Sequence, residues 1–148
     1  MSPFPDMGYI TALDGKIIQI PPCLIQRSGV AYASNIVTMS SVNYTDVPNL
    51  SVAVTLEVPC TVLLIATLLS YASGTRTAYF QFTDVANAAI GMEWRHIITD
   101  PVDRHLITPI ALGAGIVGLN TFKLRWKSSE ASAIGLVERY MIALAWPG

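Results

Sequence analysis

The residues most able to carry out chemistry gather in one segment near the middle of the chain. Acids and bases with suitable side chains fall close together there: Glu93, Arg95, His96, Asp100, Asp103, Arg104 and His105. Such groups can bind a metal ion or transfer protons. Their spacing matches no established ligand pattern, and acids and bases that alternate in a loop commonly pair with each other or with water. We therefore interpret the segment as a solvated or interface loop and expect no catalytic residue, metal site or cofactor.

Two further patterns also lack the context that their chemistry needs. Residues 113–118 fit Gly-x-Gly-x-x-Gly, but a predicted strand follows where a dinucleotide-binding motif needs a helix, so we predict a turn. A serine nucleophile would need a motif such as Gly-x-Ser-x-Gly, and the sequence contains none.

Cys23 and Cys60 are too few for a disulfide framework or a four-ligand zinc site. We interpret them as buried thiols, with one disulfide between them as the alternative.

Exposed aromatic residues can form a platform for sugar binding on the loops or faces of a β-sandwich. The candidates are Tyr44, Tyr71, Tyr79, Trp94 and Trp146. Most of them fall in predicted strands, which favours a role in the core or in contacts between subunits.

The composition indicates a chain with more apolar surface than an ordinary soluble domain. Apolar residues make up 52% of the 148 residues and charged residues 13%, whereas ordinary soluble domains contain about 25% charged residues. Either a membrane or partner subunits must cover the surplus apolar surface. Two uncharged stretches are candidate membrane spans, but prolines and glycines interrupt Val58–Thr75 and His105–Phe122, so we expect no membrane span.

The net charge and the N-terminal sequence argue against a nucleic-acid-binding protein and against a secreted one. The net charge is −1 and the basic residues are scattered singly, which argues against nucleic acid as a partner. Pro3, Pro5 and Asp6 stand where a secretory signal would have a basic and then an apolar region. We therefore expect no cleaved leader, and we interpret the two glycosylation sequons as chance matches.

Alternating apolar residues predict several half-buried strands. The alternation is clean in Leu50–Glu57 and Thr75–Thr83, and clearest in Thr121–Lys127, where Phe122, Leu124 and Trp126 point inward and three basic residues outward: Lys123, Arg125 and Lys127. Shorter predicted strands are Asn35–Ser40, Met92–Ile98 and Arg104–Leu112. A turn is expected over Tyr44–Asn49, where a Pro-Asn pair stands.

Cys60–Tyr71 is apolar on both faces, which predicts a strand with its own core on one side and a different partner on the other. Ser73-Gly74 then predicts a turn that pairs this strand with Thr75–Thr83 in a hairpin. In the last strand, Gly135–Trp146, we expect Leu136, Tyr140, Ile142, Leu144 and Trp146 on or near one core-facing side, with Glu138 on that side too.

About eight strands without a convincing amphipathic helix predict an all-β fold. We expect an antiparallel two-sheet sandwich, a jelly roll, formed by residues 33–148. Residues 1–32 are broken by prolines and glycines, with one short strand possible at Lys16–Ile20. We expect these residues to form an extended N-terminal arm that gains order by lying on its own domain or on a neighbour.

The order of motifs resembles that of small jelly-roll domains in virion proteins of tailed bacteriophages. Ser41–Val52 is similar to their first strands and the turn between them, Leu112–Trp126 to a Gly-rich turn followed by a late strand, and Arg139–Leu144 to their last strand. The resemblance covers about Asn35–Trp146. Asn49 stands where glycine is usual and Asn120 where histidine is usual. Asparagine also suits turns, so neither departure disturbs the expected fold.

The resemblance implies capsid decoration, fibre or tail components, and in some cases receptor binding, with no catalytic residues. We therefore expect a self-associating virion structural protein, a trimer assembled in the host cytoplasm, that binds the major capsid protein or another virion protein. The candidate contact residues are Phe4, Tyr9, Ile18, Ile20, Tyr71, Trp94 and Trp146. The alternative is a receptor- or carbohydrate-binding module of a tail fibre. An enzyme would instead require His96 and His105 to meet Glu93 or Asp103 in one cleft.

Overall fold

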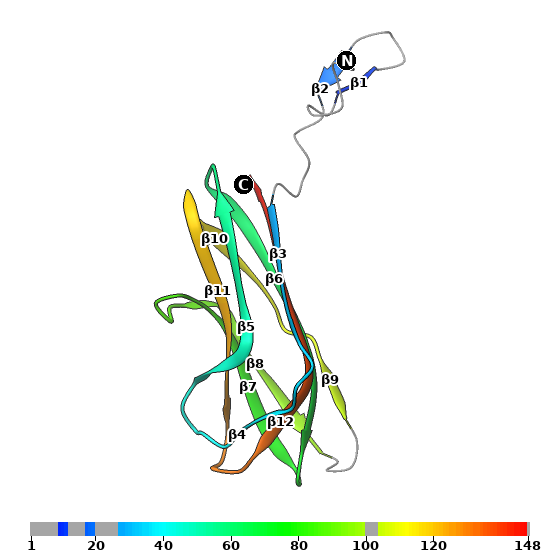
Figure 1. Cartoon of the computed structure of the whole chain (residues 1–148), viewed down its shortest axis with the longest axis vertical. Helices are drawn as coiled ribbons and strands as arrows, with labels where there is room; N and C mark the ends of the chain where they lie inside the picture. Colours follow the sequence, from blue (N-terminus) through cyan, green and yellow to red (C-terminus); the bar gives the residue numbers. More distant parts are fainter. Residues whose placement is uncertain (1–8, 12–16, 20–26, 100–103, 148) are drawn as a thin grey trace.

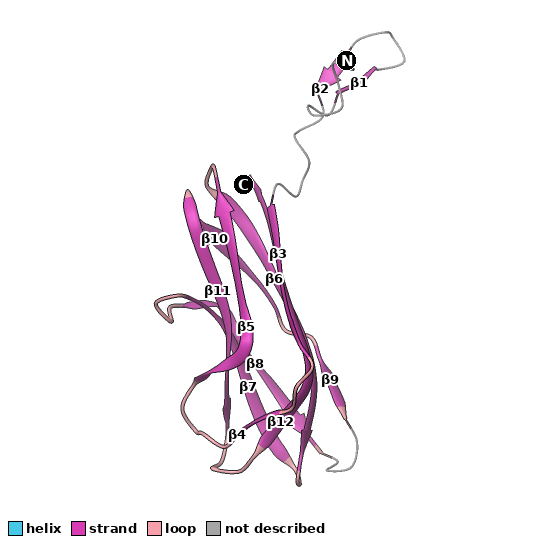
Figure 2. Ribbon diagram, in the orientation of Figure 1, coloured by secondary structure: helices cyan, strands magenta, loops and turns pink. Residues whose placement is uncertain are grey.

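The computed structural model describes residues 9–11, 17–19, 27–99 and 104–147, and within them it contains strands and no helix (Figures 1 and 2). Twelve strands are present in this part of the chain. Two antiparallel sheets pack face to face in the jelly-roll arrangement, as the alternating patterns predicted. No helix long and apolar enough to cross a membrane occurs among the described residues.

The first sheet is built around the longest apolar strands. Its order is β10 (Ile110–Gly115), β6 (Cys60–Ala72), β12 (Ile134–Pro147) and β3 (Arg27–Ala33), with β4 (Val37–Met39) beside β12 and β9 (His105–Ile107) beside β6. The second sheet has the order β5 (Thr45–Leu56), β11 (Gly118–Ser128), β7 (Arg76–Asp84) and β8 (Ala89–Ile98).

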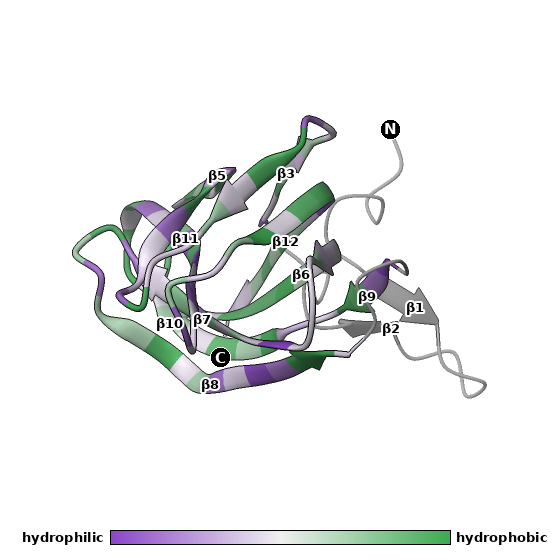
Figure 3. Cartoon of the chain, turned by 90° about the horizontal axis from the view of Figure 1, so that it is seen from below, coloured by the Kyte–Doolittle hydropathy of each residue, from purple (hydrophilic) through white to green (hydrophobic). Residues whose placement is uncertain are grey.

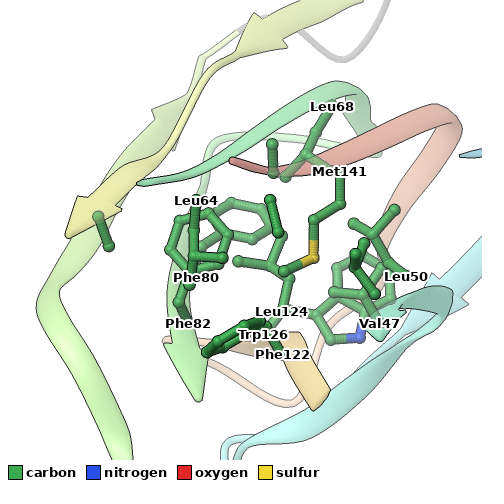
Figure 4. Packing of buried hydrophobic residues seen from close by; sticks show 14 of the residues in the cluster. Val47, Leu50, Leu64, Leu68, Phe80, Phe82, Phe122, Leu124, Trp126 and Met141 are labelled. Atoms are coloured by element: carbon green, nitrogen blue, oxygen red, sulfur yellow. The ribbon is translucent and has the colours of Figure 1, made fainter. Parts of the chain in front are cut away.

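The core fills the space between the two sheets (Figure 4). The alternating side chains of β5, β7 and β11 point into it as predicted, and Phe80, Leu124 and Trp126 are fully or almost fully buried. From the first sheet, Leu64, Leu68 and Met141 complete the packing, together with the other members of the buried cluster.

Two separate strands precede the sandwich. β1 (Tyr9–Thr11) and β2 (Ile17–Gln19) pair with each other, and β2 falls in the segment where the sequence allowed one short strand. β3 lies within the segment that the sequence assigned to the arm, yet it pairs with β12 along seven residues. The division of the chain into arm and domain stays a prediction.

The predicted hairpin of Cys60–Tyr71 with Thr75–Thr83 is wrong. The two strands exist as β6 and β7, but β6 pairs with β9, β10 and β12, whereas β7 pairs with β8 and β11. Ser73-Gly74 therefore carries the chain from one sheet to the other. Local turn signals cannot distinguish a hairpin from such a crossing, because both need only a tight reversal of the chain.

Several predicted boundaries also change. The expected turn at Pro48-Asn49 is a bulge inside β5, where Asn49 has a φ of 60°. The expected strand Arg104–Leu112 is divided into β9 and β10 around Thr108-Pro109. The glycines at 113 and 115 lie inside β10 rather than in a turn. A Cβ on Gly115 would overlap Leu56, so this glycine permits a close approach of the two sheets.

The predicted core face of the last strand is wrong beyond Leu136. A register shift between Leu136 and Arg139 inserts one extra residue into β12 opposite β6. Such a bulge reverses which residues face inward. Arg139 and Met141 therefore point into the core, with Ala143 and Ala145 after them, and Glu138 is exposed. Residues 140, 142, 144 and 146 point away from the core.

Candidate functional site

The outer side of the first sheet is covered by apolar side chains, and we call this surface the outer apolar face. It consists of four rows of residues that are paired across the strands: Tyr32, Tyr140 and Thr67; Val30, Ile142, Ile65 and Ile110; Ser28, Leu144, Leu63 and Leu112; Trp146, Thr61 and Ala114. Three small hydroxyl residues are the only polar members of these rows, and none is charged.

Several of these side chains are open to solvent, which is unusual for large apolar residues on adjacent strands. Val30 is 65% exposed and Leu112 is 62% exposed, at opposite edges of the sheet. The predicted double apolar character of β6 is confirmed: its even-numbered residues from Val62 to Leu68 are buried, and the odd-numbered ones lie half-buried on the outer side. Single exposed apolar residues are normal, but a contiguous patch marks an interaction surface.

Tyr32 and Tyr140 form an aromatic pair at one end of this face. Their rings stack with centroids 4.3 Å apart, and the two residues are 50% and 42% exposed. Partial desolvation raises the pKa of Tyr140 above the usual value of a tyrosine, and the neighbouring Tyr32 raises it further. The pair therefore places two stacked aromatic rings on the outer side of β3 and β12.

A groove of about 620 Å³ runs along the seam between β8 and β10. Its apolar walls are Met92, Trp94, Ile110 and Leu112, and Glu93 and Arg95 stand at its rim. The indole Nε1 of Trp94 donates a hydrogen bond of 3.0 Å to the carbonyl oxygen of Ile110, which holds the ring in the wall. Ile110 and Leu112 belong to the outer apolar face as well, so the groove continues that face around its β10 edge.

A break in the pairing of β8 forms the groove. The register shifts between Phe80 and Phe82, so that residues 91–93 stand opposite Gln81 alone. Gly91 has a φ of 71°, and a Cβ there would come within 2.9 Å of the Ala111 side chain. Because β8 bulges at this point while touching β10 through Gly91, a hollow opens beside Met92. Figure 3 shows β8 along the lower edge of the sandwich.

The outer side of the second sheet has the opposite character. Lys123 and Arg125 bind Asp46 at 3.0 and 3.1 Å. Lys127 binds Glu93 at 3.1 Å, and its Nζ lies 4.5 Å from the Tyr44 ring centroid and 4.9 Å from that of Tyr79. The three basic residues of β11 thus face outward as predicted. The acids around them satisfy their charges.

The hydroxyl of Tyr44 donates a hydrogen bond to the Glu93 carboxylate. Desolvation raises the pKa of Tyr44 strongly, and the neighbouring carboxylate raises it further. The hydrogen bond from Tyr44 is the main reason why the pKa of Glu93 lies below its usual value, and Lys127 lowers it further. Glu93 is thus held as an ionised acceptor within this network.

The two histidines of the predicted polar segment do come together. His96 is in β8 and His105 in β9, and their ring centroids are 5.6 Å apart with an edge contact. The Nε2 atom of each ring is buried and has no hydrogen-bond partner among the described residues. Burial lowers the pKa of His96, and His105 lowers it further.

The other members of that segment lie apart from the histidines or outside the described residues. Glu93 is taken up by Tyr44 and Lys127 on the second sheet, while Asp100 and Asp103 are not described. Among the described residues, no group of three or more His, Cys, Asp and Glu side chains is placed to hold a metal ion. Glu93–His96 lie in β8, which confirms the predicted strand Met92–Ile98, so the interpretation of the polar segment as a loop is wrong for these residues.

The structure separates the predicted contact residues. Trp146 lies on the outer apolar face and Trp94 in the wall of the groove, whereas the Tyr71 ring covers Gly135 of the adjacent strand. Tyr9 and Ile18 fall in β1 and β2, but their side chains are outside the described residues, as are Phe4 and Ile20. The five candidate aromatic residues for sugar binding do not form one platform. Only Tyr44 and Tyr79 meet, around Lys127.

Cys60 is buried, and its thiol donates a weak hydrogen bond of 3.3 Å to the Val58 carbonyl oxygen. Its predicted character as a buried thiol agrees with this position. Cys23 lies outside the described residues, so its burial and a disulfide between the two remain alternatives from the sequence.

Sequence reasoning missed the part of the outer apolar face that lies on β12, because the bulge at residues 137–138 reverses the facing of Tyr140, Ile142 and Leu144. Nothing in the local pattern marks the extra residue. One signal in the sequence could have indicated this surface. Large apolar residues occur on both faces of β6, and a strand paired with β6 has the same apolar surroundings on both of its sides.

The sequence matches no protein-family model and no curated protein. Solved structures share the fold. Dimeric latent PorU from Porphyromonas gingivalis has a TM-score of 0.52 at 10% identity, over 81% of this chain and 12% of the PorU chain. The PRD1 vertex protein P5 has a TM-score of 0.47 at 8% identity, over 100% of this chain and 85% of P5.

A carbohydrate-binding module, TmCBM61 in complex with β-1,4-galactotriose, has a TM-score of 0.42 at 10% identity, over 79% of this chain and 86% of the module. At such identities the likeness concerns the fold alone.

Proposed function

We propose that this chain is a self-associating structural subunit of a virion surface, in which copies of the chain cover one another's outer apolar face. The observation that carries the proposal is the set of four uncharged rows across β3, β12, β6 and β10. The proposal assigns no catalytic step to the chain.

The size of the face supports an association of defined geometry. Four strands about 4.8 Å apart and seven residues at about 3.3 Å each give a patch of about 400 Å² before side-chain relief is counted. That is within the roughly 300–600 Å² of the largest apolar patch on a typical soluble monomer, a patch that often has a function. A standard interface buries roughly 800 Å² per partner, so a complete interface needs this face together with its rim.

The chemistry of the face favours a second copy over a partner selected by charge. No charged residue stands in the four rows to select such a partner, whereas the face of another copy is equally apolar. Burial of each large side chain contributes about 1.5–3 kcal/mol of hydrophobic free energy. A cyclic trimer would satisfy this requirement if the three faces met around its axis.

The virion assignment rests on the sequence resemblance over Asn35–Trp146. A decoration or auxiliary capsid protein fits a single sandwich with an N-terminal segment that can bind the major capsid protein. A fibre or tail location is the other form of the same assignment. Immunogold labelling of particles would distinguish the two, since label on the capsid shell supports decoration and label on the tail supports a fibre component.

A charge placed in the middle of the face tests the proposal. We expect Ile142→Glu to remain folded and to shift association to at least tenfold higher protein concentration, because the carboxylate would have to be buried without a partner. Thr55→Glu, on the exposed outer side of the second sheet, is the matched control and should associate like the wild type. Mass from light scattering is the measurement. A wild-type protein that stays monomeric at micromolar concentration would overturn the proposal.

A glycan-binding module is the second candidate, and the pairing of Tyr44 and Tyr79 around Lys127 favours it. Two aromatic rings beside hydrogen-bonding groups are the elements of a sugar site. The test is binding of the isolated protein to a glycan array, with Tyr79→Ala expected to remove the signal. Absence of glycan binding by the wild type would exclude this candidate.

A further inference from the structure

We propose that the Tyr32–Tyr140 pair of one copy occupies the groove between β8 and β10 of a second copy. This inference rests on the proposed self-association and deepens it, because it names the part of the second copy that fills the groove. The aromatic pair lies on the β12–β3 side of the first sheet and the groove lies along its β10 edge, so one contact between two copies can join the pair of one to the groove of the other.

The groove and the aromatic pair match in character. The walls of the groove are Met92, Trp94, Ile110 and Leu112, so an aromatic ring would replace water against apolar atoms. Met92 is 80% exposed, and its side chain can adapt to the shape of a ring. A groove of about 620 Å³ lies in the range of sites that hold molecules larger than one aromatic side chain.

The rim of the groove matches the polar ends of the tyrosines. Arg95 is exposed at the rim, and a guanidinium can stack on an aromatic ring or donate to a phenol oxygen. Tyrosines combine an apolar ring with a polar tip, which explains their enrichment at the energetic centres of interfaces. A docked pair would therefore leave its hydroxyls at the polar rim.

The contact cannot form within one copy. β3 and β10 are separated by β12 and β6 in the sheet, so their backbones lie about 14 Å apart at the usual strand spacing. The groove lies beyond β10, on the side of β8. A Tyr32–Tyr140 pair that fills the groove must therefore come from another copy, and continuity of the groove with the outer apolar face through Ile110 and Leu112 brings a neighbour docked on that face within reach.

A substitution in the groove but outside the four rows tests the inference. We expect Met92→Glu to raise the concentration needed for association at least tenfold. The matched control is Leu119→Glu, on β11, since Leu119 is 70% exposed and belongs to neither surface. If Ile142→Glu dissociates the assembly and Met92→Glu does not, the groove inference fails while the proposed function stands. A monomeric wild type overturns both.

A cross-link gives an independent measurement that does not depend on weakened association. Tyr32→Cys and Met92→Cys are combined in one chain that also carries Cys23→Ser. Their separation within one copy exceeds the roughly 7 Å that a disulfide can span between Cα atoms. Under mild oxidation we expect covalent oligomers, and none from the control pair Tyr32→Cys with Leu119→Cys. An assembled protein that yields no Tyr32→Cys to Met92→Cys cross-link contradicts the inference.

Discussion

At the scale of single residues, Arg139 is the most unusual side chain of the core. It is 0% exposed, and within the described part of the chain its hydrogen bonds go to carbonyl and amide oxygens rather than to a carboxylate. Its guanidinium donates to the carbonyl oxygen of Pro48 at 2.7 Å, and to the carbonyl and side-chain oxygens of Asn35 at 2.6 and 2.9 Å. Burial lowers its pKa. Arg139 thus joins the bulge of β12 to the bulge of β5 and to the loop after β3.

Removing this guanidinium should therefore be costly. We predict that Arg139→Ala lowers the free energy of unfolding by about 3 kcal/mol, because three partly buried hydrogen bonds are lost and a cavity remains where the buried side chain stood. Urea unfolding followed by tryptophan fluorescence measures the change. Arg95→Ala, an exposed arginine, is the control and should alter stability by less than about 0.5 kcal/mol. Equal effects of the two substitutions would contradict the structural role of Arg139.

His96 makes stability depend on pH. The folded chain binds a proton at His96 less readily than the unfolded chain does, because its folded pKa is lowered. Stability from this residue is therefore complete above the ordinary histidine pKa of about 6.5 and is lost as pH falls toward the lowered value. We predict that His96→Gln reduces the loss of thermal stability between pH 7 and pH 5, as measured by the melting temperature. An unchanged pH profile in this variant argues against the role.

At the scale of elements, bulges decide which surfaces the strands present. The extra residue in β12 moves Tyr140, Ile142 and Leu144 to the outer side, and the break in β8 opens the groove beside Met92. Without either bulge the same residues would face elsewhere, since a strand alternates with a period of two. The proposed interaction surface is therefore a consequence of two local irregularities.

Close packing of the edge strand β3 on β5 depends on Gly29. A Cβ at this position would overlap Cγ1 of Val52 and come within 3.2 Å of the Ala53 carbonyl oxygen. We predict that Gly29→Ala lowers the free energy of unfolding by about 1–3 kcal/mol, as overpacking does in cores. Hydrogen exchange of the β3 amides should accelerate at the same time. Ser28→Ala on the same strand is the control, and a Gly29→Ala protein as stable as this control would refute the packing argument.

At the scale of the whole molecule, the two outer sides of the sandwich differ in kind. The outer side of the second sheet carries paired charges around Asp46 and Glu93, whereas the outer apolar face carries none in its four rows. A molecule with one polar and one apolar side is suited to a shell or ring, in which the apolar side is covered and the polar side meets solvent.

Sodium chloride should therefore have little effect on association, whereas ammonium sulfate should strengthen it. We predict that raising sodium chloride from about 0.05 to 0.5 M leaves the association midpoint within about threefold, because screening acts on exposed charges and the face has none. Ammonium sulfate should strengthen association, since it favours burial of apolar surface. Sedimentation velocity measures both effects. Dissociation by sodium chloride would show that ion pairs hold the assembly together.

Much of the fold could be predicted because apolar and polar residues alternate along several of the strands. Leu50–Glu57, Thr75–Thr83 and Phe122–Trp126 each repeat with a period of two, and each forms a strand with the expected face inward. Pairing partners could not be predicted in the same way. Ser73-Gly74 is a tight reversal in both a hairpin and a crossing, and only packing of the sheets selects the crossing.

The proposed interaction site was harder to predict from the sequence than the fold. Trp94 and Trp146 were identified as contact residues from their type, yet their roles on two different surfaces depend on where β8 and β12 lie. Tyr32, Met92 and Ile142 carry no local signal at all, because exposure is a property of the finished assembly of strands. Arg139 gave no signal for the same reason: its partners at residues 35 and 48 are distant in sequence.

The sequence by itself determined the all-β class, the inward faces of three strands and the excess of apolar over charged residues. These are set by side-chain period and composition, which are local or summed quantities. Only the tertiary structure decided where the excess lies: on one side of one sheet, continuous with a groove at its edge. The physical reason is that a single added residue in β12 reverses its facing, and such a register shift has meaning only relative to the partner strand.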